Sequence, residues 1–129
     1  LSLNIAPFVP KAGTPFQWLP IAHYDPLNGR LSLLKKALPA RGIRLRSESP
    51  AWSQVQGVLA RGDVTLAKVL ATIDEVSLSG WRRAVTRCRL DTDFHTHKRW
   101  SLEKKLPWSI IDLGIKPGRL EAELKKALA

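Results

Sequence analysis

Ten residues in the second half of the chain bring together side-chain types that bind metal ions. The segment 88–97 contains five of them: Cys88, Asp91, Asp93, His95 and His97. In an extended segment, the His-x-His spacing projects both imidazole rings to one side, where a zinc ion could bind. The spacing matches no standard zinc finger, however, and Cys88 lies on the apolar face of a predicted helix. We therefore expect a core cysteine beside a polar loop, and no metal site.

A proline-rich segment near the N-terminus is the second place where the residue pattern suggests chemistry. Residues 7–18 have the sequence PFVPKAGTPFQW. Because proline fixes φ and removes a backbone donor, the segment should form a rigid loop. It follows a predicted strand, and α/β proteins bind ligands at the carboxyl ends of parallel strands. A ligand-facing loop and a purely structural turn or lid both remain open.

The elements that position this loop form a strand–helix–strand pattern. Residues 1–9 are β-prone and alternate, and residues 43–46 alternate again. Between them, leucines recur at helical spacing, namely Leu27, Leu31, Leu34 and Leu38. This order predicts a parallel βαβ unit with a right-handed crossover. We expect residues 1–9 to pair with residues 43–46, or with the edge of another molecule.

Beyond residue 48 the pattern is helical. Ser49 and Pro50 are typical of a helix start. The apolar face that follows comprises Trp52, Val55, Val58 and Leu59. A second amphipathic helix is expected from Leu66 to near Gly80, and a third carries Trp81, Ala84, Val85 and Cys88.

The remaining segment, residues 89–116, is expected to be irregular. Pro117 opens a last helix, whose apolar face comprises Leu120, Leu124 and Leu128. The fold class predicted for the whole chain is α/β, in the sense of an α+β piece. Residues 1–47 form the βα(β) unit and residues 48–129 a mainly helical region.

Length and composition exclude several classes of protein. A chain of 129 residues has the length of one domain and can bury about two-thirds of its unfolded surface. No apolar run reaches the ~18 residues that a membrane helix needs, and the single cysteine excludes an internal disulfide. We expect a cytoplasmic protein without a membrane partner. Methionine is absent even at position 1, so we expect a piece of a longer protein.

Positive charge is concentrated at the two ends of the chain. The formal net charge is +10, with +6 in residues 1–47, −2 in residues 48–80 and +6 in residues 81–129. Such a distribution is compatible with RNA or another polyanion as partner, and equally with ordinary solvated helix surfaces. The five tryptophans could stack on bases if exposed, but their apolar surroundings favour core packing.

Three motifs in order resemble one enzyme family. The run PFVPKAGTPFQW resembles the end of the last core strand of a radical S-adenosylmethionine barrel. The likeness is to iron–sulfur oxidoreductases that carry an N-terminal cobalamin-binding-like domain. VLARGD at residues 58–63 and LPW at residues 106–108, followed by IDLGI at residues 111–115, occur in the same order as in that family.

This resemblance implies a radical enzyme in the full-length protein. In the family, a [4Fe–4S] cluster held by a CxxxCxxC motif cleaves S-adenosylmethionine to a radical. Cys88 is the only cysteine here, so the chain itself lacks these ligands and would not be an enzyme alone. The resemblance places three residues near the cofactor's adenosyl group, namely Phe8, Val9 and Pro10. It places Lys11 and Thr14 near the substrate, and it leaves the use of cobalamin open.

Three functions therefore remain open. The first is the C-terminal part of such an enzyme, with the remainder of its own barrel as partner. The second is a basic helical module that binds RNA or another polyanion. The third is a structural extension that covers an exposed strand edge.

Overall fold

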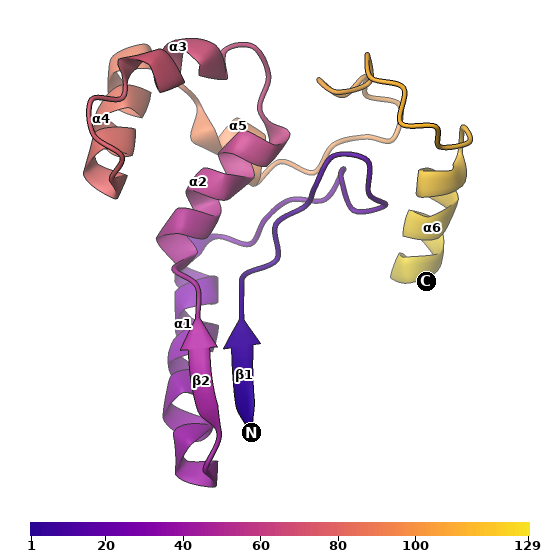
Figure 1. Cartoon of the computed structure of the whole chain (residues 1–129). Helices are drawn as coiled ribbons and strands as arrows, with labels where there is room; N and C mark the ends of the chain where they lie inside the picture. Colours follow the sequence, from indigo (N-terminus) through magenta and orange to yellow (C-terminus); the bar gives the residue numbers. More distant parts are fainter.

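The computed structural model describes residues 1–129 and combines six α-helices with one small parallel sheet (Figure 1). The sheet consists of β1 (Ser2–Ile5) and β2 (Arg44–Ser47). The helices are α1 (Tyr24–Ala37), α2 (Pro50–Arg61), α3 (Leu66–Thr72), α4 (Leu78–Cys88), α5 (Thr92–Thr96) and α6 (Arg119–Leu128). A short 3-10 helix, η1 (Pro39–Arg41), connects α1 to β2. The predicted mixture of a small sheet and predominant helix is confirmed.

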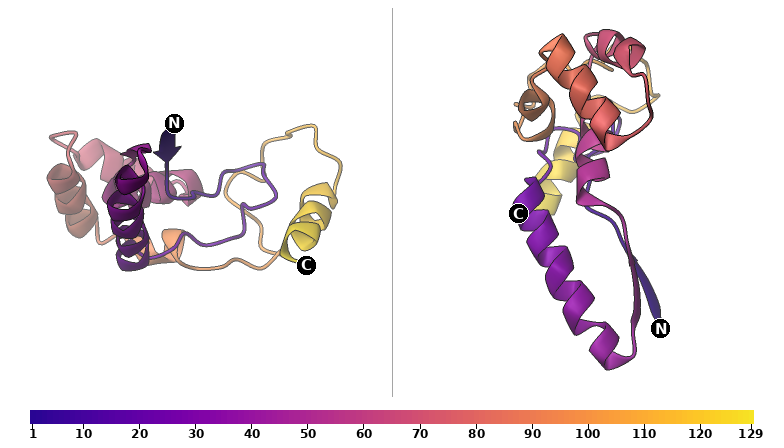
Figure 2. Two further views of the ribbon diagram at one scale, coloured as in Figure 1. Left: turned by 90° about the horizontal axis from the view of Figure 1, so that it is seen from below. Right: turned by 90° about the vertical axis from the view of Figure 1, so that its left-hand side faces the viewer.

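The two strands pair in parallel, as predicted, with Ser2 opposite Arg44 and Ile5 opposite Ser47. The first strand is shorter than the predicted residues 1–9. Pro7 lacks the N–H group that would continue the ladder, so the chain leaves the sheet just before it. Together with α1, the sheet forms a unit that projects away from the remaining helices (Figure 2).

One face of this sheet is exposed to solvent. Register and alternation place four polar side chains on it, Ser2, Asn4, Arg44 and Arg46, and all four are exposed. The opposite face carries Leu3, Ile5 and Leu45, of which Ile5 and Leu45 are half-buried. Each strand also keeps one edge without a partner, because the sheet has only two strands.

Helix α2 begins where the sequence predicts. The Ser49 hydroxyl accepts a hydrogen bond from the backbone N–H of Trp52, at 3.5 Å. The predicted apolar face is only half correct. Val55 and Val58 are buried, whereas Trp52 and Leu59 are 43% and 46% exposed. The cluster that contains α3 and α4 covers only the side of α2 that carries the two valines.

The boundary between the second and third predicted helices was wrong. Helix α3 ends at Thr72, and Val76 lies outside it with 92% of its side chain exposed. Helix α4 starts at Leu78, where the Ser77 hydroxyl accepts a hydrogen bond from the Gly80 N–H at 3.0 Å. Gly80 does not end a helix: it lies in the first turn of α4, where a Cβ would collide with the Glu75 carbonyl oxygen.

The apolar interior consists of two separate cores. Core 1, between α2, α3 and α4, comprises Val55, Val58, Leu66, Val69, Trp81 and Ala84. Core 2, between the N-terminal loop and the C-terminal segment, comprises Trp18, Trp100, Leu106 and Leu124. Core packing is thus confirmed for Trp18, Trp81 and Trp100, and is wrong for Trp52. Neither core contains a strand residue.

None of the helices combines the length and apolar character needed to cross a membrane.

A buried arginine joins the two cores. Arg61, at the end of α2, is only 1% exposed. Its Nη1 donates to the Thr96 carbonyl oxygen at 2.9 Å, and its Nη2 donates to the Lys98 carbonyl oxygen at 2.7 Å. Its guanidinium also lies 4.0 Å from the centre of the Trp100 ring. Burial lowers the pKa of Arg61 to about 10, so the group still carries its charge at neutral pH.

The segment that Arg61 holds is also paired with the N-terminal loop. The Thr96 carbonyl oxygen accepts a second hydrogen bond from the Ile21 N–H at 2.8 Å. Four residues later, the Trp100 N–H donates to the Trp18 carbonyl oxygen at 2.9 Å. Residues 18–21 and 96–100 therefore lie side by side, although about 80 positions separate them in the sequence.

Replacing this arginine should destabilise the chain strongly. Arg61→Met keeps much of the side-chain volume but leaves the Thr96 and Lys98 carbonyls without this donor. We expect a loss of about 3 kcal/mol in the free energy of unfolding, measured by urea denaturation. Arg87→Met, at an exposed position of α4, is the matched control and should change it by less than about 0.5 kcal/mol. Equal effects of the two substitutions would contradict a joining role for Arg61.

Candidate functional site

The candidate site is the proline-rich loop, residues 7–18, at the carboxyl end of β1. Buried Gln17 holds the loop in place from within. Its Oε1 accepts hydrogen bonds from the Gly13 N–H at 3.1 Å and from the Trp108 Nε1–H at 2.6 Å. Gly13 adopts φ +70°, a left-handed conformation that favours glycine. These two hydrogen bonds tie the loop to the LPW segment, a contact that its prolines did not predict.

The three residues expected near a cofactor have different surroundings. Phe8 is 54% exposed, and its ring packs edge-on against Phe16 with 5.6 Å between ring centres. Val9 and Pro10 are buried. Of these three residues, only Phe8 offers an external ligand an exposed side chain, while Val9 and Pro10 belong to the buried part of the loop.

The two residues expected near a substrate lie in the turn that follows. Lys11 is exposed and forms no ion pair, so its ammonium group is free to meet an anion. Its carbonyl oxygen accepts hydrogen bonds from the Thr14 hydroxyl at 2.7 Å and from the Thr14 N–H at 3.3 Å. Thr14 is half-buried, and its hydroxyl proton is used to close this turn.

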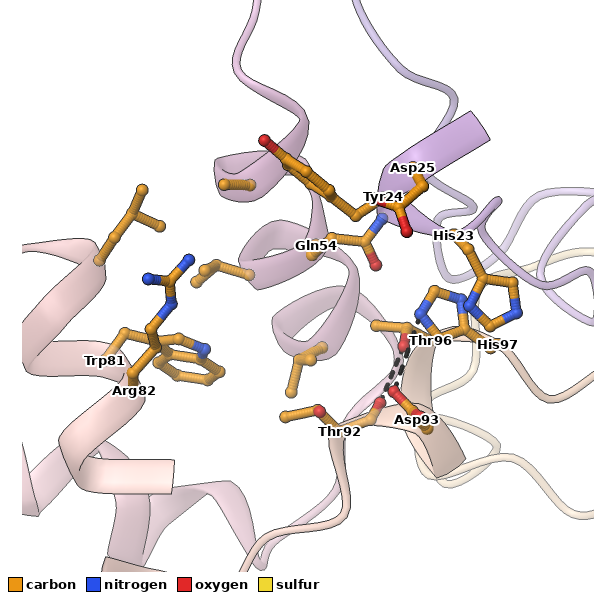
Figure 3. Close-up of a pocket in the computed structure, with 14 residues that line it drawn as sticks. His23, Tyr24, Asp25, Gln54, Trp81, Arg82, Thr92, Asp93, Thr96 and His97 are labelled. Carbon is orange, nitrogen blue, oxygen red and sulfur yellow. Dashed lines mark hydrogen bonds and ion pairs between the residues drawn. The ribbon is translucent and has the colours of Figure 1, made fainter. Parts of the chain in front are cut away.

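A cleft of about 350 Å³ lies apart from the loop, and none of residues 7–18 lines it (Figure 3). Residues from α1, α2, α4 and α5 line it. The polar side chains labelled there include His23, Tyr24, Asp25, Gln54, Arg82, Thr92, Asp93 and His97. Its volume falls in the range of small-molecule pockets. The cleft therefore has room and polar groups for a small ligand, and no sequence motif predicted it.

Two stacked imidazoles form one wall of the cleft. The rings of His23 and His97 lie 3.8 Å apart between centres, with 25° between their planes. His97 Nδ1 is 3.0 Å from the Ile21 carbonyl oxygen and donates to it. This bond leaves Nε2 on the side of Asp93, whose Oδ1 lies 3.8 Å away. No sequence pattern could pair His23 with His97, because only the packing of residue 21 against residue 96 brings them together.

The candidate metal ligands of segment 88–97 do not come together at one position. Residues 92–96 form helix α5 instead of an extended strand, so the two histidine rings do not project to one side. His95 is buried and has no partner at Nδ1, whereas His97 faces the cleft. Cys88 packs against core 1, with its Sγ 3.6 Å from the Thr72 hydroxyl oxygen. No three His, Cys, Asp or Glu side chains lie together as a metal-binding group.

Comparison of the chain with models of protein families, with curated proteins and with solved structures gives no match.

Gln17 should control the rigidity of the loop. In Gln17→Leu the Gly13 amide and the Trp108 indole lose their shared acceptor, so we expect faster hydrogen exchange at both groups. The free energy of unfolding should fall by about 1–3 kcal/mol, because two donors are left unpaired. Exposed Gln56 on α2 supplies the control Gln56→Leu, which should leave both exchange rates unchanged. Unchanged protection in Gln17→Leu would show that the loop is held by other contacts.

Proposed function

We propose that this chain is the C-terminal part of a radical S-adenosylmethionine iron–sulfur oxidoreductase. On this proposal β1, α1 and β2 belong to the end of its barrel, and the helices from α2 onward form an extension. The observation that carries the proposal is the parallel pair β1–β2, which exposes one face of polar side chains. Strand β1 of this pair leads into the loop of residues 7–18.

The exposure of the sheet supports a larger barrel around it. Parallel strands are normally covered on both faces, and two strands alone are marginal in water. Here one face carries only exposed polar side chains, both outer edges are open, and neither core includes a strand residue. Further strands of the same barrel would pair with these edges. The face with Ser2, Asn4, Arg44 and Arg46 would then line the barrel interior, where polar groups could meet substrate.

The position of the loop supports its role at the mouth of that barrel. Phe8 would offer its ring to the adenine of S-adenosylmethionine, and the buried residues Val9 and Pro10 would hold that ring in place. Lys11 would meet a carboxylate or phosphate of the substrate, with Thr14 closing the turn that presents it. These roles come from the resemblance, and the rigidity of the loop is compatible with them.

The cluster itself must be held elsewhere. A [4Fe–4S] cluster in this family needs three thiolates, and the chain offers one half-buried cysteine, Cys88, packed against core 1. The residues present therefore do not fit the cluster, and none of them takes part in its chemistry. Nothing in the loop or the cleft identifies a cobalamin site.

A second candidate function is the binding of RNA or another polyanion. The observation that favours it is a group of cationic side chains around Phe94 and Trp100 that form no salt bridge.

The primary test examines the intact protein. The coding sequence upstream of Leu1 should contain CxxxCxxC about 150–200 residues earlier, given barrels of roughly 250 residues. Purified without oxygen and reduced, the protein should cleave S-adenosylmethionine. An upstream region without a cysteine triad would overturn the proposal.

Phe8 gives a sharper test in the same protein. Phe8→Ala removes the ring proposed to contact adenine, so the KM for S-adenosylmethionine should rise about tenfold while the cluster content stays unchanged. Val64→Ala, which trims a fully exposed side chain between α2 and α3, is the control and should leave the KM unaltered. A Phe8→Ala protein with a normal KM would remove this residue from the cofactor site.

A further inference from the structure

Three cationic side chains converge on two aromatic rings beside α5. The Lys104 ammonium lies 4.4 Å from the centre of the Trp100 ring and 4.6 Å from that of Phe94. The Lys98 ammonium lies 5.3 Å from the centre of the Phe94 ring. On the buried side, the Arg61 guanidinium lies 4.0 Å from the Trp100 ring. Cation–π attraction holds the lysine ammonium groups in place at this surface.

This cationic cluster has no ion pair of its own. The salt bridges of the chain involve Arg83, His97 and Arg119, and none includes Arg61, Lys98 or Lys104. The carboxylate of Asp63 is near enough to act on Lys104, but it accepts hydrogen bonds from the Thr65 N–H at 2.9 Å and the Thr65 hydroxyl at 2.6 Å. One acidic group thus faces three positive charges.

The repulsion within the cluster affects Lys104. Burial is the first cause that lowers the pKa of this lysine, and the charges of Lys98 and Arg61 lower it further. An anion placed between the two lysines would relieve this repulsion. Because the ammonium groups are already gathered, little side-chain entropy would be lost on binding.

We propose that Phe94, Lys98 and Lys104 form a binding site for single-stranded RNA. The lysine ammonium groups would turn from the Phe94 ring to backbone phosphates, which would uncover the ring for stacking on a base. Phe94 is 37% exposed, and a base stacks on an aromatic side chain without regard to sequence. This proposal rests on the second candidate function, the binding of RNA or another polyanion, and names the residues that would bind it. It does not depend on the radical-enzyme proposal.

The neighbouring residues extend the positive surface along the chain. Arg99 and Lys105, directly beside Lys98 and Lys104 in the sequence, are both exposed. A strand that passes along residues 98–105 would therefore meet two further cations, with Glu103 as the one acidic residue of this stretch. A single small anion would contact only part of this positive surface, so a polyanion fits the surface better.

The test measures binding of a fluorescently labelled oligouridylate to the 129-residue chain at several salt concentrations. Lys98→Gln/Lys104→Gln should weaken binding about tenfold or more and reduce the salt slope by about 1.4, as expected for two lost phosphate contacts. Phe94→Leu, which keeps both charges, should weaken binding about fivefold or more and leave the slope unchanged. Circular dichroism establishes that each variant is folded.

The matched control is Lys35→Gln/Lys36→Gln, which removes the same charge from exposed positions at the far end of α1. It should bind like the parent chain. Equal losses in the two double variants would show binding by net charge alone and overturn the site.

Heparin is the second probe, because it carries charge without bases. Heparin binding as tight as that of the oligouridylate, together with normal binding by Phe94→Leu, would overturn the assignment to RNA. Since neither cluster nor S-adenosylmethionine is present, no outcome bears on the radical-enzyme proposal.

Discussion

The buried guanidinium of Arg61 is the constraint on which most of the tertiary structure depends. Removing a charge from water is costly unless polar partners replace the solvent. Arg61 meets this requirement at Nη1 and Nη2, which donate to the backbone carbonyls of residues 96 and 98, while its Nε has no hydrogen-bond partner. The end of α2 therefore determines where the segment 96–100 runs. That segment in turn pairs with residues 18–21, which begin at the last residue of the proline-rich loop. The geometry of the candidate site thus depends on a side chain in another part of the chain.

Trp100 connects this interior arrangement to the surface. The indole is 4% exposed and packs in core 2 with Trp18, Leu106 and Leu124. The cations of Arg61 and Lys104 both lie against its ring, the one buried and the other near solvent. An aromatic ring can attract both cations without neutralising either, so the positive potential persists at the surface. The contacts that stabilise the fold therefore also explain why cations gather around Phe94.

Stability is distributed unevenly along the chain. Neither core contains a residue of β1, α1 or β2, and the two strands are largely exposed. Regions with few buried apolar contacts open at low free-energy cost. The two-stranded sheet is therefore the least self-sufficient part of this chain. The helices, in contrast, have their own apolar interior.

Local features of the sequence were enough to predict the elements but not their surroundings. Ser49 and Pro50 set the start of α2, and the alternation of residues 43–46 indicated a strand, because capping and periodicity act between near neighbours. The proline loop was likewise predictable, since proline restricts its own backbone. Tertiary structure alone decided that Trp52 is exposed, that Arg61 is buried and that His23 stacks on His97. Each of these depends on groups in other elements of the chain, and helical or strand periodicity carries no information about which segment covers a side chain.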